Sequence, residues 1–280
     1  LKNKILYEIF FIRVIIKNYN ITVGDIMLSK AEIEKYKKDG YVIPKFSMPE
    51  EILKKIEFKH DELLAKYPEF KNYCPAVLSY DEGFLEFCKN DNILDYVEQI
   101  IGPDFALWNS SFFAKPAHNG HATPWHQDGQ YWPIKPLATC TVWLAIDDAT
   151  IENGCLKFIE GSHTDQKLKS HNLNENKNLT LNQELNKKEY DETKAVNLTL
   201  KRGQISLHDV YLIHGSEANN SPKSRRAITM RFMPTTSFFD HQMVKEKKMF
   251  SKLNTSKYSD RKIYHMRGID VSGKNNLTYP

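Results

Sequence analysis

The feature that most constrains the fold is a change of pattern at Phe105. From there the chain consists of short segments rich in β-branched and aromatic residues, separated by Gly, Pro, Asn and Asp. The segments are FALWNSSFFAK, TCTVWLAIDD, GCLKFIEG, AVNLTL, GQISLHDVYLIHG and RRAITMRFMP. Such a series is typical of antiparallel strands in a sandwich or barrel. We therefore predict a mainly β fold with a jelly-roll core.

The part of the chain before this change is predicted to be helical. The Ser-x-x-Glu pattern of a helix cap occurs at Ser29 and again at Ser47, and it predicts helices near 29–39 and 47–66. A third run with helical spacing of apolar residues, 93–101, ends at a Gly-Pro pair that stops helices. We expect these helices to flank the β core.

Two segments differ from the rest in composition. Residues 164–202 are dominated by Asn, Lys, Glu and Leu, and we predict an excursion or lid beside the sheet. Residues 1–26 precede Met27, which lies just before a helix start. We predict that they form an N-terminal extension upstream of the true start and that residues 27–280 form a single domain. The apolar stretch within this extension is short and interrupted by charges, so it does not predict a membrane span.

Composition and charge exclude several classes of protein. The 280 residues are 41% hydrophobic and 26% charged, as in soluble globular proteins. The net charge of +4 is spread along the chain, which does not favour nucleic-acid binding. The four cysteines fit neither a metal pair nor a disulfide framework, so we predict reduced, mostly buried thiols in a cytoplasmic protein. They are Cys74, Cys88, Cys140 and Cys155. The sequence does not indicate an oligomeric state.

The strongest chemical signal is the segment PWHQDGQYWP, residues 124–133. In an extended strand His126 and Asp128 lie on one face, so both can reach one metal ion. Two His and one carboxylate form a common iron site that leaves open positions for substrate and oxygen. A second His-x-Asp pair, His163 and Asp165, follows a turn and leads into the polar segment. We prefer the first pair for that reason.

The third ligand must come from further along the chain, where the candidates are His163, His171, His208 and His214. We predict His214, because it ends an apolar strand just before a turn. His208 has the same strand parity and is the strongest alternative, unless it is a strand residue that forms a local hydrogen bond.

An arginine follows His214 after eleven residues, at the start of the next strand. A hairpin would bring Arg225 back towards His214, which suits a ligand that holds the metal with one end and arginine with the other. The dicarboxylate 2-oxoglutarate is such a ligand. Ser216 could donate a hydrogen bond to the same carboxylate. Arg226 is the competing choice, because alternation points only one of the two arginines inward.

In this order the motifs resemble the phytanoyl-CoA dioxygenase family of Fe(II)- and 2-oxoglutarate-dependent oxygenases, over about residues 28–235. The resemblance implies a double-stranded β-helix fold. It places iron on His126, Asp128 and His214. It places 2-oxoglutarate at Arg225 and Ser216, and adds Gln127 and Trp143 as neighbours of the cosubstrate. For Trp143, core packing is an equal alternative.

The resemblance also implies a reaction. A C–H bond of a small-molecule substrate would be hydroxylated with O2 while 2-oxoglutarate is converted to succinate and CO2. Halogenating relatives replace the carboxylate ligand with a small residue, so Asp128 favours hydroxylation. Tyr131, Trp132 and the 164–202 segment are candidate pocket walls. The substrate could be an acyl-CoA, but we expect a small polar or anionic metabolite. The alternatives are a non-catalytic jelly roll that binds a small anion or metal, and a similar metal enzyme that does not use 2-oxoglutarate.

Overall fold

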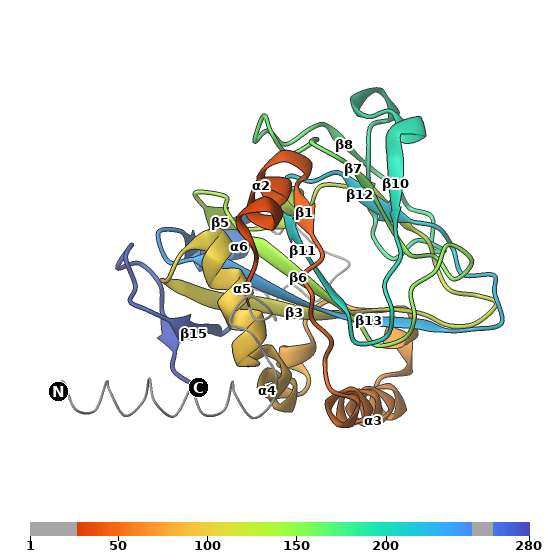
Figure 1. Cartoon of the computed structure of the whole chain (residues 1–280), viewed down its shortest axis with the longest axis horizontal. Helices are drawn as coiled ribbons and strands as arrows, with labels where there is room; N and C mark the ends of the chain where they lie inside the picture. The colour runs from red at the N-terminus through yellow and green to blue at the C-terminus, as the bar shows by residue number, and fades with distance from the viewer. Residues whose placement is uncertain (1–26, 248–259) are drawn as a thin grey trace.

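The computed structural model describes residues 27–247 and 260–280, and its core is two sheets that face each other (Figure 1). The strand order of the larger sheet is β1-β11-β6-β13-β3-β15-β16, with β2 also paired to β3. The order of the smaller sheet is β10-β7-β12-β4. All of these pairings are antiparallel except that of β15 with β16. The structure therefore confirms the predicted jelly roll.

The strand bounds show how far the predicted segments extend. The larger sheet is built from β1 (Tyr41–Val42), β2 (Tyr73–Cys74), β3 (Phe105–Lys115), β6 (Cys140–Ala145), β11 (Ile205–Asp209), β13 (Arg225–Pro234), β15 (Ile263–Arg267) and β16 (Leu277–Thr278). The smaller sheet is built from β4 (Thr123–His126), β7 (Leu156–Ile159), β10 (Ala195–Leu198) and β12 (His214–Ser216). A short pair, β5 (Ile134–Lys135) with β14 (Phe238–Phe239), lies outside both sheets.

Helices cover the outer face of the larger sheet (Figure 1). They are α2 (Lys30–Asp39), α3 (Glu50–Lys66), α4 (Leu85–Cys88) and α5 (Asp91–Ile101); α6 (His241–Lys247) follows the sheet. The predicted third helix is α5, which begins after an Asn90 cap and ends at Gly102. Its apolar residues, among them Ile93 and Val97, pack in one cluster with Phe112 and Ile228 of the sheet. The helices thus close the outer layer of the core and leave the inner face of the sheet for the site.

The two predicted helix caps differ in outcome. At the start of α2, the Ser29 hydroxyl accepts from the Glu32 amide at 3.2 Å, and the Glu32 carboxylate accepts from the Ser29 amide at 2.7 Å. The predicted cap of the next helix was wrong. Helix α3 begins at Glu50 after Pro49 and has no side-chain cap. The chain just after Ser47 is instead bonded to the turn before β11, because the Met48 amide donates to the Gly203 carbonyl at 2.8 Å.

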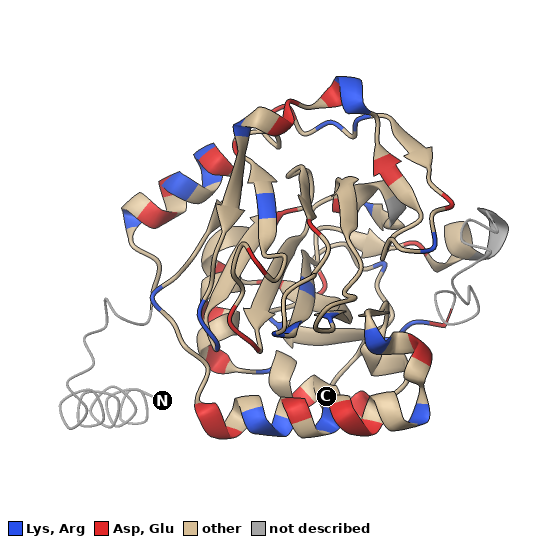
Figure 2. Cartoon of the chain, turned by 90° about the vertical axis from the view of Figure 1, so that its right-hand side faces the viewer, with Lys and Arg blue, Asp and Glu red and all other residues tan. Residues whose placement is uncertain are grey.

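The polar 164–202 segment runs beside the smaller sheet and ends inside it. It contains a hairpin of β8 (His171–Leu173) and β9 (Gln183–Leu185), and its last part forms β10, which pairs with β7. Figure 2 shows basic and acidic residues mixed along the helices.

All four cysteines are buried and none forms a disulfide, as predicted. In the part of the chain that the structure describes, no helix is long and apolar enough to cross a membrane. The predicted extension, residues 1–26, lies outside the described residues.

The capping box of α2 gives a direct stability prediction. Replacing Ser29 by Ala removes the acceptor of the Glu32 amide and should lower the free energy of unfolding by about 1 kcal/mol. Ser47→Ala is the matched control, because Ser47 is also exposed but caps no helix, and it should change stability by less than about 0.5 kcal/mol. Urea unfolding of the two variants checks this, and equal losses would contradict the assignment of the caps.

His60 of α3 predicts a pH dependence. Its ring is buried and stacks on Phe112 with centroids 4.2 Å apart, and burial, aided by the charge of Arg226, lowers the pKa of His60 to about 4. The unfolded chain therefore binds this proton more readily, so the contribution is complete above pH 6.5 and is lost as the pH falls towards 4. From pH 7 to pH 5 the loss should be about 2 kcal/mol. Urea unfolding at both pH values should show a smaller loss for His60→Leu; an equal loss would contradict this.

Candidate metal centre

The three predicted metal ligands meet between the two sheets. His126 ends β4 and His214 begins β12, and the two are direct partners in the antiparallel ladder. Asp128 follows two residues after His126, at the start of the 3-10 turn η5 (Asp128–Tyr131). All three side chains are buried, and one ligand atom from each lies within 4.8 Å of the others. A strand pairing thus brings together residues that are far apart in the sequence.

Backbone carbonyls fix the orientation of both imidazole rings. His126 Nδ1 lies 2.8 Å from the Pro124 carbonyl oxygen, and His214 Nδ1 lies 2.9 Å from that of Leu212. A carbonyl can only accept, so each Nδ1 carries the hydrogen and each Nε2 keeps its lone pair. The two Nε2 atoms lie 3.5 Å and 4.0 Å from Asp128 Oδ1. This arrangement is the usual support for imidazoles that bind a metal.

The electrostatics of the group suit a divalent cation. Burial alone would raise the pKa of Asp128, but the neighbouring His126 and His208 rings and the charge of Arg231 hold that pKa well below its usual range. Burial, with the nearby His126, lowers the pKa of His214 well below 6.5. The group therefore presents one carboxylate and a neutral imidazole at neutral pH, which is the protonation state that metal binding needs.

His208 lies beside this group but outside it. It projects from β11 of the opposite sheet, with its Nε2 3.7 Å from Asp128 Oδ2 and its ring centroid 5.1 Å from that of His214. Neither ring nitrogen has a partner within 3.5 Å in the described part of the chain. The local hydrogen bond considered as the alternative for His208 is therefore absent. The predicted single strand ending at His214 was wrong, because the chain turns after Asp209 and His214 begins β12 of the other sheet. The shared parity of His208 and His214 therefore did not apply, and their proximity comes from the facing of the two sheets.

The other two candidate histidines are held elsewhere. His163 Nε2 lies 3.0 Å from the Lys37 carbonyl oxygen, and its partner Asp165 forms an ion pair with Lys169. The structure does not bring this second His-x-Asp pair to the metal group. His171 accepts a hydrogen bond from the Gln127 amide at 3.1 Å and so lies next to the ligand strand, on the side of the polar segment.

Of the two arginines, Arg225 faces the cavity that holds the metal group. Its guanidinium is buried, lies 5.4 Å from the ring centroid of Trp143, and donates to the carbonyl oxygens of Phe113 at 3.0 Å and Gly154 at 3.1 Å. Burial lowers the pKa of Arg225 to about 10. Its Nε has no hydrogen-bond partner among the described residues. The side chain is therefore charged at neutral pH and can accept an anion.

Arg226 points to the opposite face, as strand alternation requires. It forms ion pairs with Asp147 at 2.8 Å and with Glu57 of α3 at 2.6 Å. These bonds tie the outer helix layer to the sheet. They leave Arg225 as the arginine of the site.

Ser216 and Trp143 line the same cavity as Arg225. The Ser216 hydroxyl is buried and has no hydrogen-bond partner in the described ranges, so it is available to an acidic ligand. The cavity is lined by Phe113, Thr123, His126, Asp128, Thr141, Trp143, Leu156, His208, His214, Ser216, Arg225, Thr229 and Arg231. Two imidazoles, one carboxylate and a buried guanidinium are a donor set whose chemistry suits a metal ion and an acidic ligand.

Gln127 does not line this cavity. Its side chain turns to the other face and donates to the carbonyl oxygens of Lys167 at 3.0 Å and Tyr211 at 2.7 Å, while it accepts from the Lys169 amide at 2.7 Å. The physical reason is the two-residue period of an extended strand, which turns Gln127 away when its neighbours turn inward. We therefore do not assign Gln127 to the cosubstrate.

One residue at the cavity was missed in the sequence. Arg231 is six residues after Arg225 on β13, is buried, and lies 5.1 Å from the ring centroid of Trp132. Arg231 is an even number of residues after Arg225 on one strand, so the spacing could have predicted that both face the cavity. Trp132 packs in turn on Trp108, with centroids 4.6 Å apart, and so stands behind Arg231. The side chain of Tyr131 is not among those described.

Comparison with known proteins agrees with this geometry. The sequence model of the phytanoyl-CoA dioxygenase family matches residues 21–227. Human peroxisomal phytanoyl-CoA dioxygenase is 29% identical over 226 residues, which cover 78% of this chain and 64% of that protein. A phytanoyl-CoA dioxygenase domain-containing protein 1 homolog of Dictyostelium discoideum is 31% identical over 173 residues, 61% of this chain and 62% of the relative. The chain thus spans less than two thirds of either relative's length.

Solved structures show the same fold. The non-heme monooxygenase ThoJ, in its apo form, superposes with a TM-score of 0.68 at 21% identity, over 88% of this chain and 87% of ThoJ. EvdO2 from Micromonospora carbonacea, complexed with 2-oxoglutarate, has a TM-score of 0.61 at 20% identity, over 74% of this chain and 91% of EvdO2. At this identity the structures support the fold alone, and the match of the family model to most of the sequence decides the family. The chain therefore belongs to the phytanoyl-CoA dioxygenase family.

Proposed function

We propose that this protein is an Fe(II)- and 2-oxoglutarate-dependent oxygenase that hydroxylates a C–H bond of a small molecule and releases succinate and CO2. The observation that carries the proposal is one buried cavity that holds His126, Asp128 and His214 at one end and Arg225 at the other. Membership of the family supports it. So do relatives of the same fold described as complexes with 2-oxoglutarate, and with Fe3+ and alpha ketoglutarate.

Each part of the cavity has a role in this proposal. The His126, Asp128 and His214 side chains would bind Fe(II) on one face and leave the remaining positions open, and bound Fe(II) supplies the activation of O2. Arg225 and the Ser216 hydroxyl would receive the distal carboxylate of 2-oxoglutarate. Trp143 would form the side of the channel beneath the Arg225 guanidinium. Burial of the whole group keeps water from the reacting atoms.

Asp128 favours hydroxylation over halogenation. Its carboxylate would take a position on the metal that a halide ion would otherwise need. The Thr141 hydroxyl, 3.4 Å from the second carboxylate oxygen, helps to hold Asp128 in place.

The metal assignment predicts a difference between the two His-x-Asp pairs. Asp128→Ala removes one of three ligands and should weaken anaerobic Fe(II) binding by more than about 100-fold. Asp165→Ala is the control, because its pair lies outside the metal group, and it should bind Fe(II) as the wild type does. Equilibrium dialysis of both proteins measures the affinities. Equal affinity in wild type and Asp128→Ala would rule out this site.

The two arginines predict a matched test of the cosubstrate. Arg225→Gln removes the charged partner of the distal carboxylate and should raise the Kd for 2-oxoglutarate at least about tenfold. Arg226→Gln removes an arginine from the other face and should leave that Kd within about twofold. The visible band that forms when Fe(II) and 2-oxoglutarate bind together anaerobically gives the Kd. If the wild type shows no band, or offered acyl-CoAs, phosphonates and amino acids yield no succinate, a binding protein without catalysis is the better description.

A further inference from the structure

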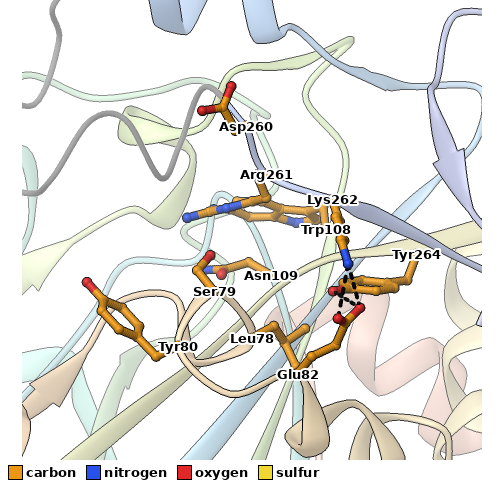
Figure 3. Close-up of a pocket in the computed structure, with 10 residues that line it drawn as sticks. All are labelled: Leu78, Ser79, Tyr80, Glu82, Trp108, Asn109, Asp260, Arg261, Lys262 and Tyr264. Carbon is orange, nitrogen blue, oxygen red and sulfur yellow. Dashed lines mark hydrogen bonds and ion pairs between the residues drawn. The ribbon is translucent and has the colours of Figure 1, made fainter. Parts of the chain in front are cut away.

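A second cavity has a volume of about 430 Å³, and Figure 3 shows the residues that line it. This volume is in the range of pockets that hold small organic molecules. It is lined by Leu78, Ser79, Tyr80, Glu82, Trp108, Asn109, Asp260, Arg261, Lys262 and Tyr264. Figure 3 shows Arg261 and Trp108 together at this cavity, and the Trp108 ring centroid is 5.5 Å from Arg261 Cζ.

A thin wall of side chains separates this cavity from the metal site. Asn109 lines the second cavity, and its amide nitrogen donates to the Ser111 hydroxyl at 3.2 Å. Arg231 lines the metal cavity and donates to the same hydroxyl at 2.6 Å. Trp108 and Trp132 continue the wall by packing on each other. One hydrogen-bonded series, Asn109–Ser111–Arg231, therefore leads from the second cavity to the metal cavity.

Space decides where a substrate can be accommodated. The metal cavity has a volume of only about 20 Å³, close to the minimum for one water molecule. Side chains must shift there even to admit a cosubstrate, and a second organic molecule does not fit. The neighbouring cavity is about twenty times larger, and the side chains of Asn109, Ser111 and Arg231 lie between the two.

Charge decides which substrate suits this position. Arg231 is 4% exposed, and its Nε has no hydrogen-bond partner within residues 27–247 and 260–280. Its Nη1 bonds the neutral Ser111, and the guanidinium lies over Trp132 and Phe113. Asp128 is the carboxylate near Arg231, and its charge would be matched by the proposed metal ion. With Fe(II) and a doubly charged cosubstrate bound, the ionised groups lining the metal cavity leave one positive charge unmatched, which is costly in a buried site.

We propose that the 430 Å³ cavity holds the substrate and that the substrate carries an oxyanion group, a carboxylate or a phosphonate, that pairs with Arg231. Naming the ligand as the substrate rests on the proposed function. The binding of an oxyanion at Arg231 does not depend on the proposed function. Arg231 thus selects the substrate, at the end of the site opposite to Arg225.

Binding of matched probes tests the charge preference. Benzoate, phenylphosphonate and the neutral benzamide have the same ring, and tryptophans in the wall make intrinsic fluorescence a suitable signal. The wild-type protein is loaded with Zn(II) and saturated with 2-oxoglutarate, so that Arg225 is occupied. We expect the acids to bind at least tenfold more tightly than benzamide, and the stronger of the two acids identifies the oxyanion. Equal binding of acid and amide by the wild type would overturn the proposal.

Substitutions test whether Arg231 is the positive charge that binds the acids. Arg231→Gln should lose at least tenfold in affinity for the acids and keep its affinity for benzamide, whereas Arg231→Lys should recover most of the loss. Arg267→Gln is the control, because Arg267 forms ion pairs with Asp95 and Glu98 on the outer side and should bind as the wild type does. Ser79→Trp fills the exposed mouth of the cavity without touching Arg231, and should weaken binding of all three probes even if the Arg231 variants do not fold. Unchanged binding in Ser79→Trp would place the probes elsewhere.

The cosubstrate distinguishes the two proposals. If Arg231→Gln weakens 2-oxoglutarate and leaves benzoate unchanged, Arg231 serves the cosubstrate and the substrate proposal is wrong. If the wild type does not bind 2-oxoglutarate, the proposed function fails. In that case benzoate binding without 2-oxoglutarate is compared in Arg231→Gln and Arg225→Gln, and a loss confined to Arg225→Gln overturns the Arg231 site.

Discussion

The site depends on the pairing of β12 with β4. This ladder places His214 directly opposite His126, although 88 residues separate them in the sequence. Because strand side chains alternate between faces, a shift of one residue in either strand would turn a ligand out of the interior. The carbonyls that orient the two rings, from Pro124 and Leu212, lie two residues before each ligand and move with it. The register of one strand pair thus sets the position and the orientation of the two proposed histidine ligands.

Strand β13 organises the rest of the cavity by the same rule. Arg225 and Arg231 lie on its inner face, one towards the proposed cosubstrate end and the other beside Asp128. Arg226 lies on the outer face and binds Glu57 of α3. One strand therefore supplies the charges of the interior and the anchor of the helical layer. The function and the stability of this protein are not separable at β13.

The sequence was sufficient where local periodicity decides the outcome. Most jelly-roll strands, the α2 cap and the shared face of His126 and Asp128 follow from residue spacing, although the predicted strand 203–215 is divided into β11 and β12 of different sheets. It was insufficient where a distant contact competes with a local pattern. The contact of Met48 with Gly203 displaced the expected cap at Ser47, and nothing near His208 in the sequence indicates that its ring faces Asp128. The residue pattern of one strand does not show which residues of the other sheet it will face.

Gln127 connects the polar 164–202 segment to the strand that carries His126. It lies between two proposed metal ligands, and its side chain holds the backbone of the polar segment at Lys167 and Lys169. Because these bonds use main-chain atoms, the side chains of that segment can be exchanged during evolution without releasing the anchor. A change of Gln127 would therefore release the polar segment from the strand that carries the proposed ligands, whereas changes of side chains within the segment would leave its attachment in place.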